Sequence, residues 1–421
     1  MVKINTKKFF DQISPKSYYD IAIILPLLML FIYPSRPAIG VAGFILFTIF
    51  GIIKKDLTFQ WNANILWVIF FLLYVIFFFK TTNKQAGLFE LEKKLSLLVF
   101  GSLFLFKYNK PISIPFWIIS FIILIFIRGI INFIEAFVMY RDIHLFQAFL
   151  TTRFSQHIHP TYFSIYIIVS LFGLIYLQHK RFIKLPKWLI ICYIIFSILL
   201  IIFLSSTAAI LFFLFSIVFF LIFYFYKKLK PLIATIFIIT ILLISFITIK
   251  YIPFKTINLK ETIENTILFL NNPKECTQSK EFIESSNEKR LILWKLSWEK
   301  FKENPLGYGV GSAGDVYRDV YQKYELDSFI EPLLDSHNQY LRIALEMGII
   351  GLLAYLSILI TFIVKAIKQK KYLLLFVLIS LIYFGLFESV LQRQSGVIFF
   401  VYIITFLYLY EPNLLDYNKE T

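Results

Sequence analysis

The sequence predicts an all-α integral membrane protein, and three observations support that fold class. Of its 421 residues, 59% are hydrophobic and 16% are charged, and the mean hydropathy of +0.75 lies far above that of soluble domains. Apolar runs of about 20 residues, the length at which a helix crosses the hydrocarbon, recur along most of the chain. One long polar stretch, residues 253–338, interrupts these runs. We therefore expect about twelve transmembrane helices and one long loop outside the membrane.

The individual helices follow from the apolar runs, of which the run at 95–106 is the shortest. We predict membrane spans at residues 19–33, 38–53, 63–79, 95–106, 112–139, 161–177, 188–204, 208–226, 231–252, 339–364, 372–387 and 395–410. The predicted parts are helices one to nine in 1–252, an outer loop with amphipathic helices in 253–338, and helices ten to twelve in 339–421. Cys192 falls in a span and Cys276 in the outer loop, so no disulfide between them is expected.

Basic residues set the predicted orientation, because Lys and Arg in short loops are retained on the cytoplasmic side. Clusters such as Lys370-Lys371 then lie inside together with both termini, while the outer loops hold fewer basic residues, among them Lys93 and Lys94. The 253–338 loop falls outside. Topology thus accounts for the formal charge of +16, and nucleic-acid binding is not needed to explain it.

The outer loop contains one clear helix signal. Ser285 and Glu288 have the spacing of a capping box, which predicts a helix starting just after Ser285. Apolar residues at steps of three and four are expected on one face of it: Leu291, Trp294, Trp298 and Phe301. Asn304-Pro305 should end this amphipathic helix, which we expect to pack against the helix bundle or the membrane surface.

The glycine-rich segment GVGSAG, residues 309–314, fits the dinucleotide-binding pattern by its letters. That fingerprint needs a strand before it and a helix after it in a soluble βαβ unit, whereas this segment follows a helix in an outer loop. We therefore expect a turn at which two backbones approach closely.

Polar residues cluster at four places along the predicted outer membrane boundary. They are Arg153, His157 and His159 in TTRFSQHIHPTYFS, Arg290 in the amphipathic helix, Asp335-Ser336-His337-Asn338 before the tenth span, and Glu388, Gln392 and Arg393 in FESVLQRQSG. Because polar groups are costly inside lipid, a site is expected at this boundary. Apart from Arg128 and Glu135 near the outer end of the fifth span, the interior spans are nearly free of charge.

Simpler roles compete with function at several of these positions. Arg153 and Arg393 are equally consistent with anchors that reach the lipid headgroups. Asp335 or Ser336 is suited to cap the tenth span. Arg342 and Glu346, four residues apart, are expected to pair within their helix.

His337 is the predicted catalytic base, because an imidazole near its ordinary pKa accepts a proton at neutral pH. The predicted diphosphate contacts are Arg153, Arg290 and Arg393, since planar guanidinium groups bind phosphate through two donors and keep their charge. The predicted supporting residues are Asp335, Asn338, His159 and Glu388. A base and a phosphate clamp at a membrane surface predict group transfer from a lipid-linked diphosphate. The chain has no Asp-x-Asp pair, so chemistry without a metal or other cofactor is expected.

With these residues in place, the chain resembles the O-antigen ligase and polymerase family of bacterial membrane glycosyltransferases. The resemblance rests on RLILWKLSWEKFKENPLGYGVG from Arg290, on DSHNQYLRIALEMGIIGLLAYL from Asp335, and on the long outer loop between the ninth and tenth spans. It is strongest over residues 290–355 and looser over the whole chain. It implies a GT-C-like helical fold in the bacterial inner membrane, with transfer by inversion on the periplasmic face.

The resemblance also implies substrates and roles. The donor would be a glycan on undecaprenyl diphosphate, His337 would be the base, Arg290 a diphosphate contact, and Arg153 a less sharply defined outer-loop arginine. Family members often carry a basic residue after the seventh span, where this chain has Thr207 and Ala208. Arg393 would then replace that charge, or the donor binds differently.

The sequence does not identify the acceptor of the glycan. Lipid A-core as acceptor would make the protein a ligase, and another lipid-linked glycan would make it a polymerase; related family members glycosylate proteins. A carrier or flippase for a lipid-linked glycan would need a similar number of helices, but should place ionisable groups near the bilayer midplane.

Overall fold

The helices account for most of the chain. The computed structural model describes residues 14–180, 182–183, 185–226, 267–268, 271, 286–323, 329–331 and 333–412. Its long helices are α2 (Tyr18–Ile32), α3 (Ala38–Ile53), α4 (Ile65–Phe78), α5 (Lys84–Leu103), α6 (Ile114–Ile143), α8 (Pro160–His179), α9 (Lys187–Leu204), α10 (Thr207–Tyr226), α15 (Ser286–Glu303), α16 (Ala313–Lys323), α17 (Gln339–Lys368), α18 (Tyr372–Phe387) and α19 (Gln394–Tyr410). Shorter turns are η1 (Phe146–Phe149), α7 (Thr151–Phe154) and η3 (Val390–Gln392). The predicted helical fold is confirmed.

Nearly every predicted span within the described residues corresponds to a helix with bounds a few residues away. Four of these helices, α6, α8, α9 and α17, are long and apolar enough to cross a membrane by length and composition. The predicted span at 231–252 and Cys276 lie outside the described residues. Cys192 is exposed on α9 and has no disulfide.

The prediction was wrong for the span at 95–106. The helix there, α5, begins eleven residues earlier at Lys84, so Lys93 and Lys94 lie within it and not in an outer loop. The charges of α5 are tolerated because Glu90 and Lys94 are buried against each other and against α17. The all-α prediction also missed a small antiparallel pair, β1 (Leu57–Phe59) and β2 (Phe106–Tyr108), beside α3.

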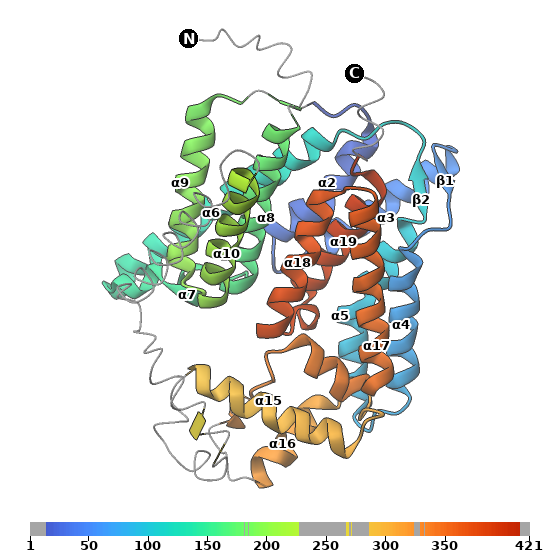
Figure 1. Cartoon of the computed structure of the whole chain (residues 1–421), viewed down its shortest axis with the longest axis vertical. Helices are drawn as coiled ribbons and strands as arrows, with labels where there is room; N and C mark the ends of the chain where they lie inside the picture. The colour runs from blue at the N-terminus through green and yellow to red at the C-terminus, as the bar shows by residue number, and fades with distance from the viewer. Residues whose placement is uncertain are drawn as a thin grey trace.

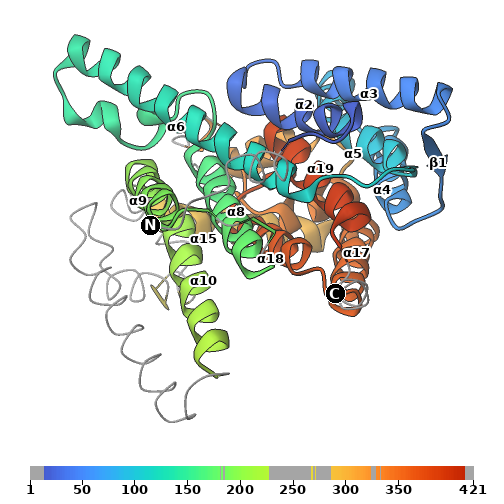
Figure 2. The same ribbon diagram turned by 90° about the horizontal axis from the view of Figure 1, so that it is seen from above.

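Helices α8 and α19 form the centre of the bundle. Most side chains of both are buried, and Tyr166 of α8 packs on Phe399 of α19 with ring centroids 3.9 Å apart. Phe172 of α8 stacks on Phe376 of α18 at 4.0 Å. Seen from above, α18 and α19 separate α4, α5 and α17 on one side from α8, α9 and α10 on the other (Figure 2). The centre is therefore aromatic and tightly packed.

Helices α15 and α16 lie across one end of this bundle, and the first and last helices meet at the other end (Figure 1). Tyr108 there stacks on Tyr19 of α2, and its backbone N–H donates to the hydroxyl of Tyr410 in α19 at 3.0 Å. The two ends of the bundle thus differ: one carries both ends of the described chain, and the other carries the helices of the outer loop.

Helix α15 begins at Ser286 and ends at Glu303, as the capping box and Asn304-Pro305 predict. The predicted apolar face is only partly right. Phe301 is buried, but Trp298 is 49% exposed, and the covered side runs through Ile292, Leu293 and Leu296. The reason is that α15 packs against both α16 and α17, which turns its smaller aliphatic residues inward.

The turn that follows α15 fills a break in α17. Gly348 interrupts that helix with φ +62°, and an added Cβ there would lie 2.3 Å from the carbonyl oxygen of Pro305. Backbone bonds join the two segments, with Tyr308 N–H donating to Leu345 O at 2.8 Å and Ile349 N–H donating to Pro305 O at 2.8 Å. These bonds satisfy polar groups that a broken helix would leave unpaired. In the glycine segment itself, a Cβ added at Gly309 would lie 2.8 Å from the backbone nitrogen of Thr81, and one added at Gly311 would lie 2.6 Å from that of Gly87, so the expected close-approach turn is confirmed.

Candidate active site

His337 lies just before the N-terminus of α17 and contacts a buried carboxylate. Its Nδ1 lies 3.2 Å from Oε2 of Glu388, which follows α18, and 3.6 Å from Oδ1 of Asp335. The Glu388 side chain is 8% exposed and that of His337 is 37% exposed. Both described carboxylate contacts use Nδ1, which orients the ring and leaves Nε2 as the nitrogen outside these two contacts.

The local sequence explains this placement of His337. Asn338 caps α17 by accepting from the backbone N–H groups of Tyr340 at 3.0 Å and Leu341 at 3.1 Å. The expected cap at Asp335 or Ser336 is therefore wrong, because Asp335 instead accepts from the backbone N–H of His337 at 2.9 Å. His337 itself has φ +44°, the left-handed conformation that a sharp turn into a helix requires.

The residues after His337 hold the segment that carries Glu388. Asn338 Nδ2 donates to the carbonyl of Leu386 at 3.1 Å, and Gln339 Oε1 accepts from the N–H of Leu391 at 2.6 Å. From α8, the hydroxyl of Tyr162 donates to the carbonyl of Ser389 at 3.1 Å. Hydrogen bonds on both sides of Glu388 thus fix its position relative to His337.

Arg290 approaches the same carboxylate from α15. One of its terminal nitrogens lies 3.4 Å from Oε1 of Glu388, and its side chain is 33% exposed. One turn later, Trp294 Nε1 donates to the carbonyl of Ser336 at 2.8 Å. Helix α15 is therefore bonded to the loop that carries His337. The two carboxylate oxygens of Glu388 contact different residues, Oε2 contacting His337 and Oε1 contacting Arg290.

The two histidines of this region have pKa values shifted in opposite directions. The hydrogen bond with Glu388 raises the pKa of His337; burial and Arg290 oppose that shift, and the charges of Asp335 and Glu388 add to it. Burial lowers the pKa of His159, with Glu388 opposing and the positive charges of Arg393, His337 and Arg290 adding. As pH falls, His337 therefore takes a proton before His159 does.

The predicted site residues gather here with one exception. His159 directly precedes α8, and its ring lies 5.7 Å from that of Tyr162, which donates to the carbonyl of Ser389 next to Glu388. Arg393 directly precedes α19 in the same segment that carries Glu388. Arg153 lies on α7, exposed, and donates to Oε1 of Gln147 at 3.0 Å. Nearby, Arg128 donates to Glu135 at 2.7 Å, and His157 lies 3.6 Å from the same carboxylate, which forms a separate polar group on α6.

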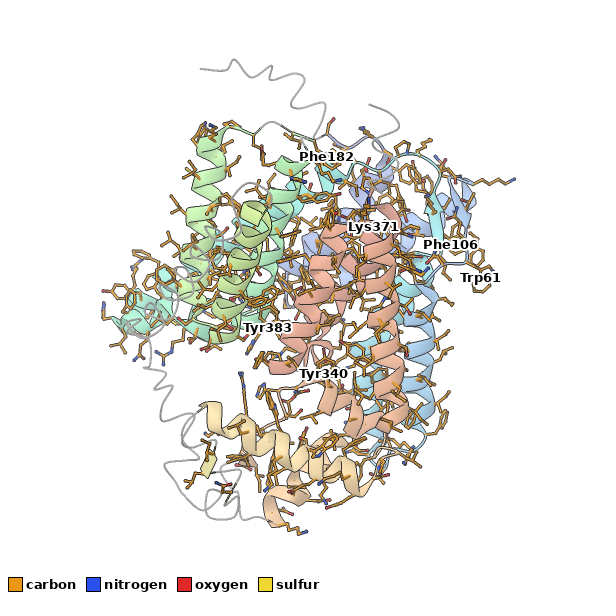
Figure 3. The ribbon with its side chains drawn as sticks, viewed as in Figure 1. Trp61, Phe106, Phe182, Tyr340, Lys371 and Tyr383 are labelled. Carbon is orange, nitrogen blue, oxygen red and sulfur yellow. The ribbon has the colours of Figure 1, made fainter. Side chains whose placement is uncertain are left out.

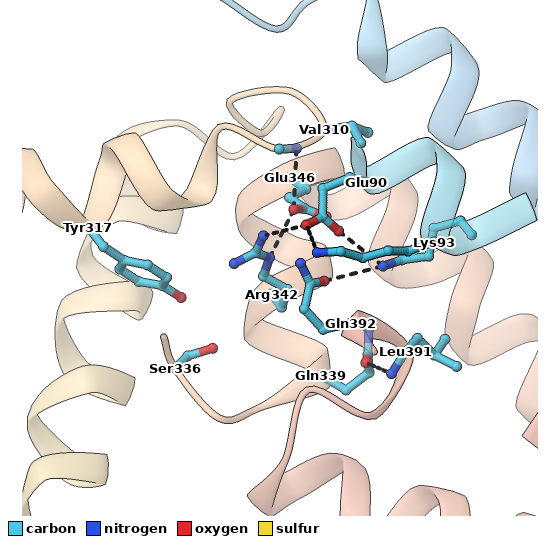
Figure 4. A network of polar contacts seen from close by, with 12 residues as sticks. Glu90, Lys93, Val310, Tyr317, Ser336, Gln339, Arg342, Glu346, Leu391 and Gln392 are labelled. Atoms are coloured by element: carbon cyan, nitrogen blue, oxygen red, sulfur yellow. Dashed lines mark hydrogen bonds and ion pairs between the residues drawn. The ribbon is translucent and has the colours of Figure 1, made fainter. Parts of the chain in front are cut away.

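Sequence reasoning missed a buried charge cluster behind the site, which we define as Glu90, Lys93, Lys94, Arg342 and Glu346. The predicted pair of Arg342 with Glu346 is confirmed, with Nε to Oε1 at 2.9 Å. It is not isolated, because Glu90 of α5 lies 3.8 Å from Arg342 and bonds Lys93 at 2.7 Å and Lys94 at 3.3 Å (Figure 4). The expectation of nearly charge-free spans is thus corrected. The i,i+4 spacing of Glu90 and Lys94 is the signal that could have found it.

Within the part of the chain that the structure describes, no group of three His, Cys, Asp or Glu side chains is arranged to hold a metal ion. What the arrangement can do chemically is take one proton at His337, stabilise the imidazolium that forms through Glu388 and Asp335, and present Arg290 to an anionic group.

Comparison with known proteins adds one finding. Residues 192–356 match the family model described as O-antigen ligase, a segment that includes Arg290 and His337 but not Glu388, Arg393, His159 or α5. A search of curated proteins found no match. The resemblance to the O-antigen ligase and polymerase family is thereby confirmed over this segment.

Proposed function

We propose that this chain, which matches the O-antigen ligase and polymerase family over residues 192–356, is an O-antigen ligase-type glycosyltransferase. It moves a glycan from undecaprenyl diphosphate to a hydroxyl of lipid A-core on the periplasmic face of the bacterial inner membrane, with both termini cytoplasmic. The observation that carries the proposal is the pairing of His337 with buried Glu388, to which Arg290 is also bound.

The chemistry follows from that pairing. The acceptor hydroxyl gives its proton to the outer nitrogen of His337 while its oxygen attacks the anomeric carbon of the donor sugar. The bond from that carbon to the diphosphate oxygen breaks, and its electron pair leaves with undecaprenyl diphosphate, inverting the anomeric centre. Glu388 and Asp335 stabilise the imidazolium that forms, and Arg290 stabilises the charge on the departing diphosphate.

Arg393 is the proposed replacement for the basic residue that family members often carry where this chain has Thr207 and Ala208. The start of α10 lies against the start of α8, because Ser206 Oγ donates to Thr161 Oγ1 at 3.2 Å. Tyr162, the next residue of α8, donates to the carbonyl of Ser389, four residues before Arg393. A cation at position 207 and one at 393 would therefore serve the same side of the site.

The polymerase reaction and a carrier role are the alternatives. The buried charge cluster removes the argument that the spans lack ionisable groups, but Arg342 and Glu346 sit in the first two turns of α17, at the end of the bundle nearest α15 and α16, away from its middle. Their mutual pairing favours a supporting role over a transport relay.

The test is a reconstituted transfer reaction. Purified wild type, His337→Ala and the control Ser357→Ala receive undecaprenyl-diphosphate-linked glycan, lipid A-core and a chelator, and products are followed by mass. We expect glycosylated lipid A-core from wild type and from the control, whose changed side chain is exposed elsewhere on α17. His337→Ala should lose about 10³-fold or more in rate, the scale of a general base. Lengthened lipid-linked glycan with unmodified core would instead identify a polymerase, and no product of either kind would leave another acceptor or a carrier role as the next hypothesis to test.

A further inference from the structure

The buried charge cluster reaches both halves of the proposed catalytic pair. On one side, Arg342 bonds Glu346 at 2.9 Å and lies 3.8 Å from Glu90, which fixes the first turns of α17 directly after His337. On the other side, Lys94 Nζ donates to Oε1 of Gln392 at 3.2 Å. Gln392 lies in η3, four residues after Glu388. One turn of α5 thus bonds the segments of both His337 and Glu388.

The geometry of the cluster makes this link rigid. The side chains of Lys94, Glu90 and Arg342 are 1%, 7% and 9% exposed, so their attractions act in a medium of low dielectric. Glu346 Oε1 also accepts from the N–H of Gly311 at 3.3 Å, which ties the glycine turn to the same cluster. Removing Lys94 or Arg342 would leave the buried Glu90 with one counter-charge fewer, which is unfavourable.

We propose that Lys94 and Gln392 are positioning residues, which hold Glu388 at hydrogen-bond distance from His337. The inference rests on the proposed function, since it assigns these residues to the same reaction. It places α5, which lies outside the family match, in the catalytic apparatus. Neither residue is proposed to touch substrate; both act through the segment that carries Glu388.

The distinguishing measurement is the pH dependence of kcat/KM. His337 must be unprotonated to act as base, so the rate falls on the acid side through its pKa, which Glu388 raises. The charged or titratable groups that face His337 are Asp335, Glu388, Arg290 and His159. If Gln392 no longer holds the Glu388 segment, the hydrogen bond to His337 weakens, its pKa falls, and the acid limb moves to lower pH.

The variants are Gln392→Leu, which removes the acceptor of Lys94 at a half-buried position, and Gln392→Glu, which keeps an acceptor there. We expect Gln392→Leu to lower kcat about tenfold or more with an acid limb at lower pH and an unchanged donor KM. Gln392→Glu should restore both the rate and the limb. Lys94→Met should behave as Gln392→Leu, and size-exclusion profiles and melting temperatures identify any variant that fails to fold.

Two results would overturn the inference. A folded Gln392→Leu variant with the wild-type rate and pH profile would show that the contact of Lys94 with Gln392 does not affect catalysis. A lower rate with the acid limb unmoved would show that the cluster supports the fold without setting the pair of Glu388 and His337. These outcomes are separable from failure of the proposed function, in which wild type itself makes no product or His337→Ala retains full transfer.

Discussion

Two polar clusters sit at opposite ends of α17, α18 and α19, and they use their hydrogen-bonding groups differently. At the end marked by Lys371 in Figure 3, Glu411 accepts from the backbone N–H groups of Leu373 at 3.0 Å and Leu374 at 2.9 Å, and Lys371 donates to the carbonyl of Tyr408. Both charged residues are nearly fully buried. This cluster caps the start of α18, and neither of its two charged side chains is accessible to a ligand.

At the other end, where α17 begins and α18 ends, Glu388 is equally buried but its partners are not. His337 and Arg290 keep about a third of their side chains exposed while they bind it. The comparison teaches that a buried carboxylate is not itself the mark of a site. What distinguishes the Glu388 cluster is that its buried member orients groups that still face outward.

The largest expected effect after loss of His337 comes from Glu388→Gln. The variant keeps the size of the side chain but removes the charge that raises the pKa of His337. We expect kcat/KM to fall by about 10²-fold, because the base is weaker and less well oriented. The acid limb of the pH profile should move to lower pH, since the pKa of His337 returns toward its ordinary value. An unmoved limb would mean that His337 is not the titrating base.

A smaller effect is expected for Arg290→Lys. Lysine keeps the charge but loses the planar pair of donors that suits a diphosphate. We expect about a tenfold weaker use of the donor, measured as donor KM and as binding of the lipid diphosphate, with the acid limb little changed. Equal donor binding by the variant would remove Arg290 from the diphosphate contacts. Arg153→Lys is the comparison for the other predicted arginine, since Arg153 donates to Gln147 and no contact within the described residues joins it to Glu388.

The sequence predicts the helices and the site motifs better than it predicts the contacts within the clusters, and the reason is physical. The apolar runs predict the helices because the bilayer demands about 20 apolar residues per span. The motifs around Arg290, His337 and Glu388 predict a site, since they pair charge with a membrane boundary. They do not predict that Glu388 joins His337 to Arg290, because those residues are far apart in the chain and only the packing of α15, α17 and α18 brings them together.

The buried charged residues are even harder to predict from the sequence than the contacts of Glu388. By composition alone, a charged helix such as α5 resembles a loop, and the sequence therefore predicts Lys94 in a loop. The contacts of Lys94 with Glu90 and Gln392 explain why its charge is tolerated inside the bundle. Glu411 follows the last predicted span and resembles any polar residue at a helix end. Its role depends on α18 beginning beside it, which is a tertiary fact.

The smallest expected effect on transfer, and the one that isolates the capping cluster, is that of Glu411→Gln. Burial raises the pKa of Glu411 to about 7 from 4.5. The folded state therefore binds a proton more tightly than the unfolded state, so this group stabilises the fold below about pH 4.5, and that contribution is lost as pH rises through about 7. Wild type should lose melting temperature over this interval, and Glu411→Gln should lose less, because glutamine does not titrate. Transfer by the variant at low temperature should match wild type. A marked loss of transfer in a folded Glu411→Gln protein would contradict the division of the molecule into a capping end and a catalytic end.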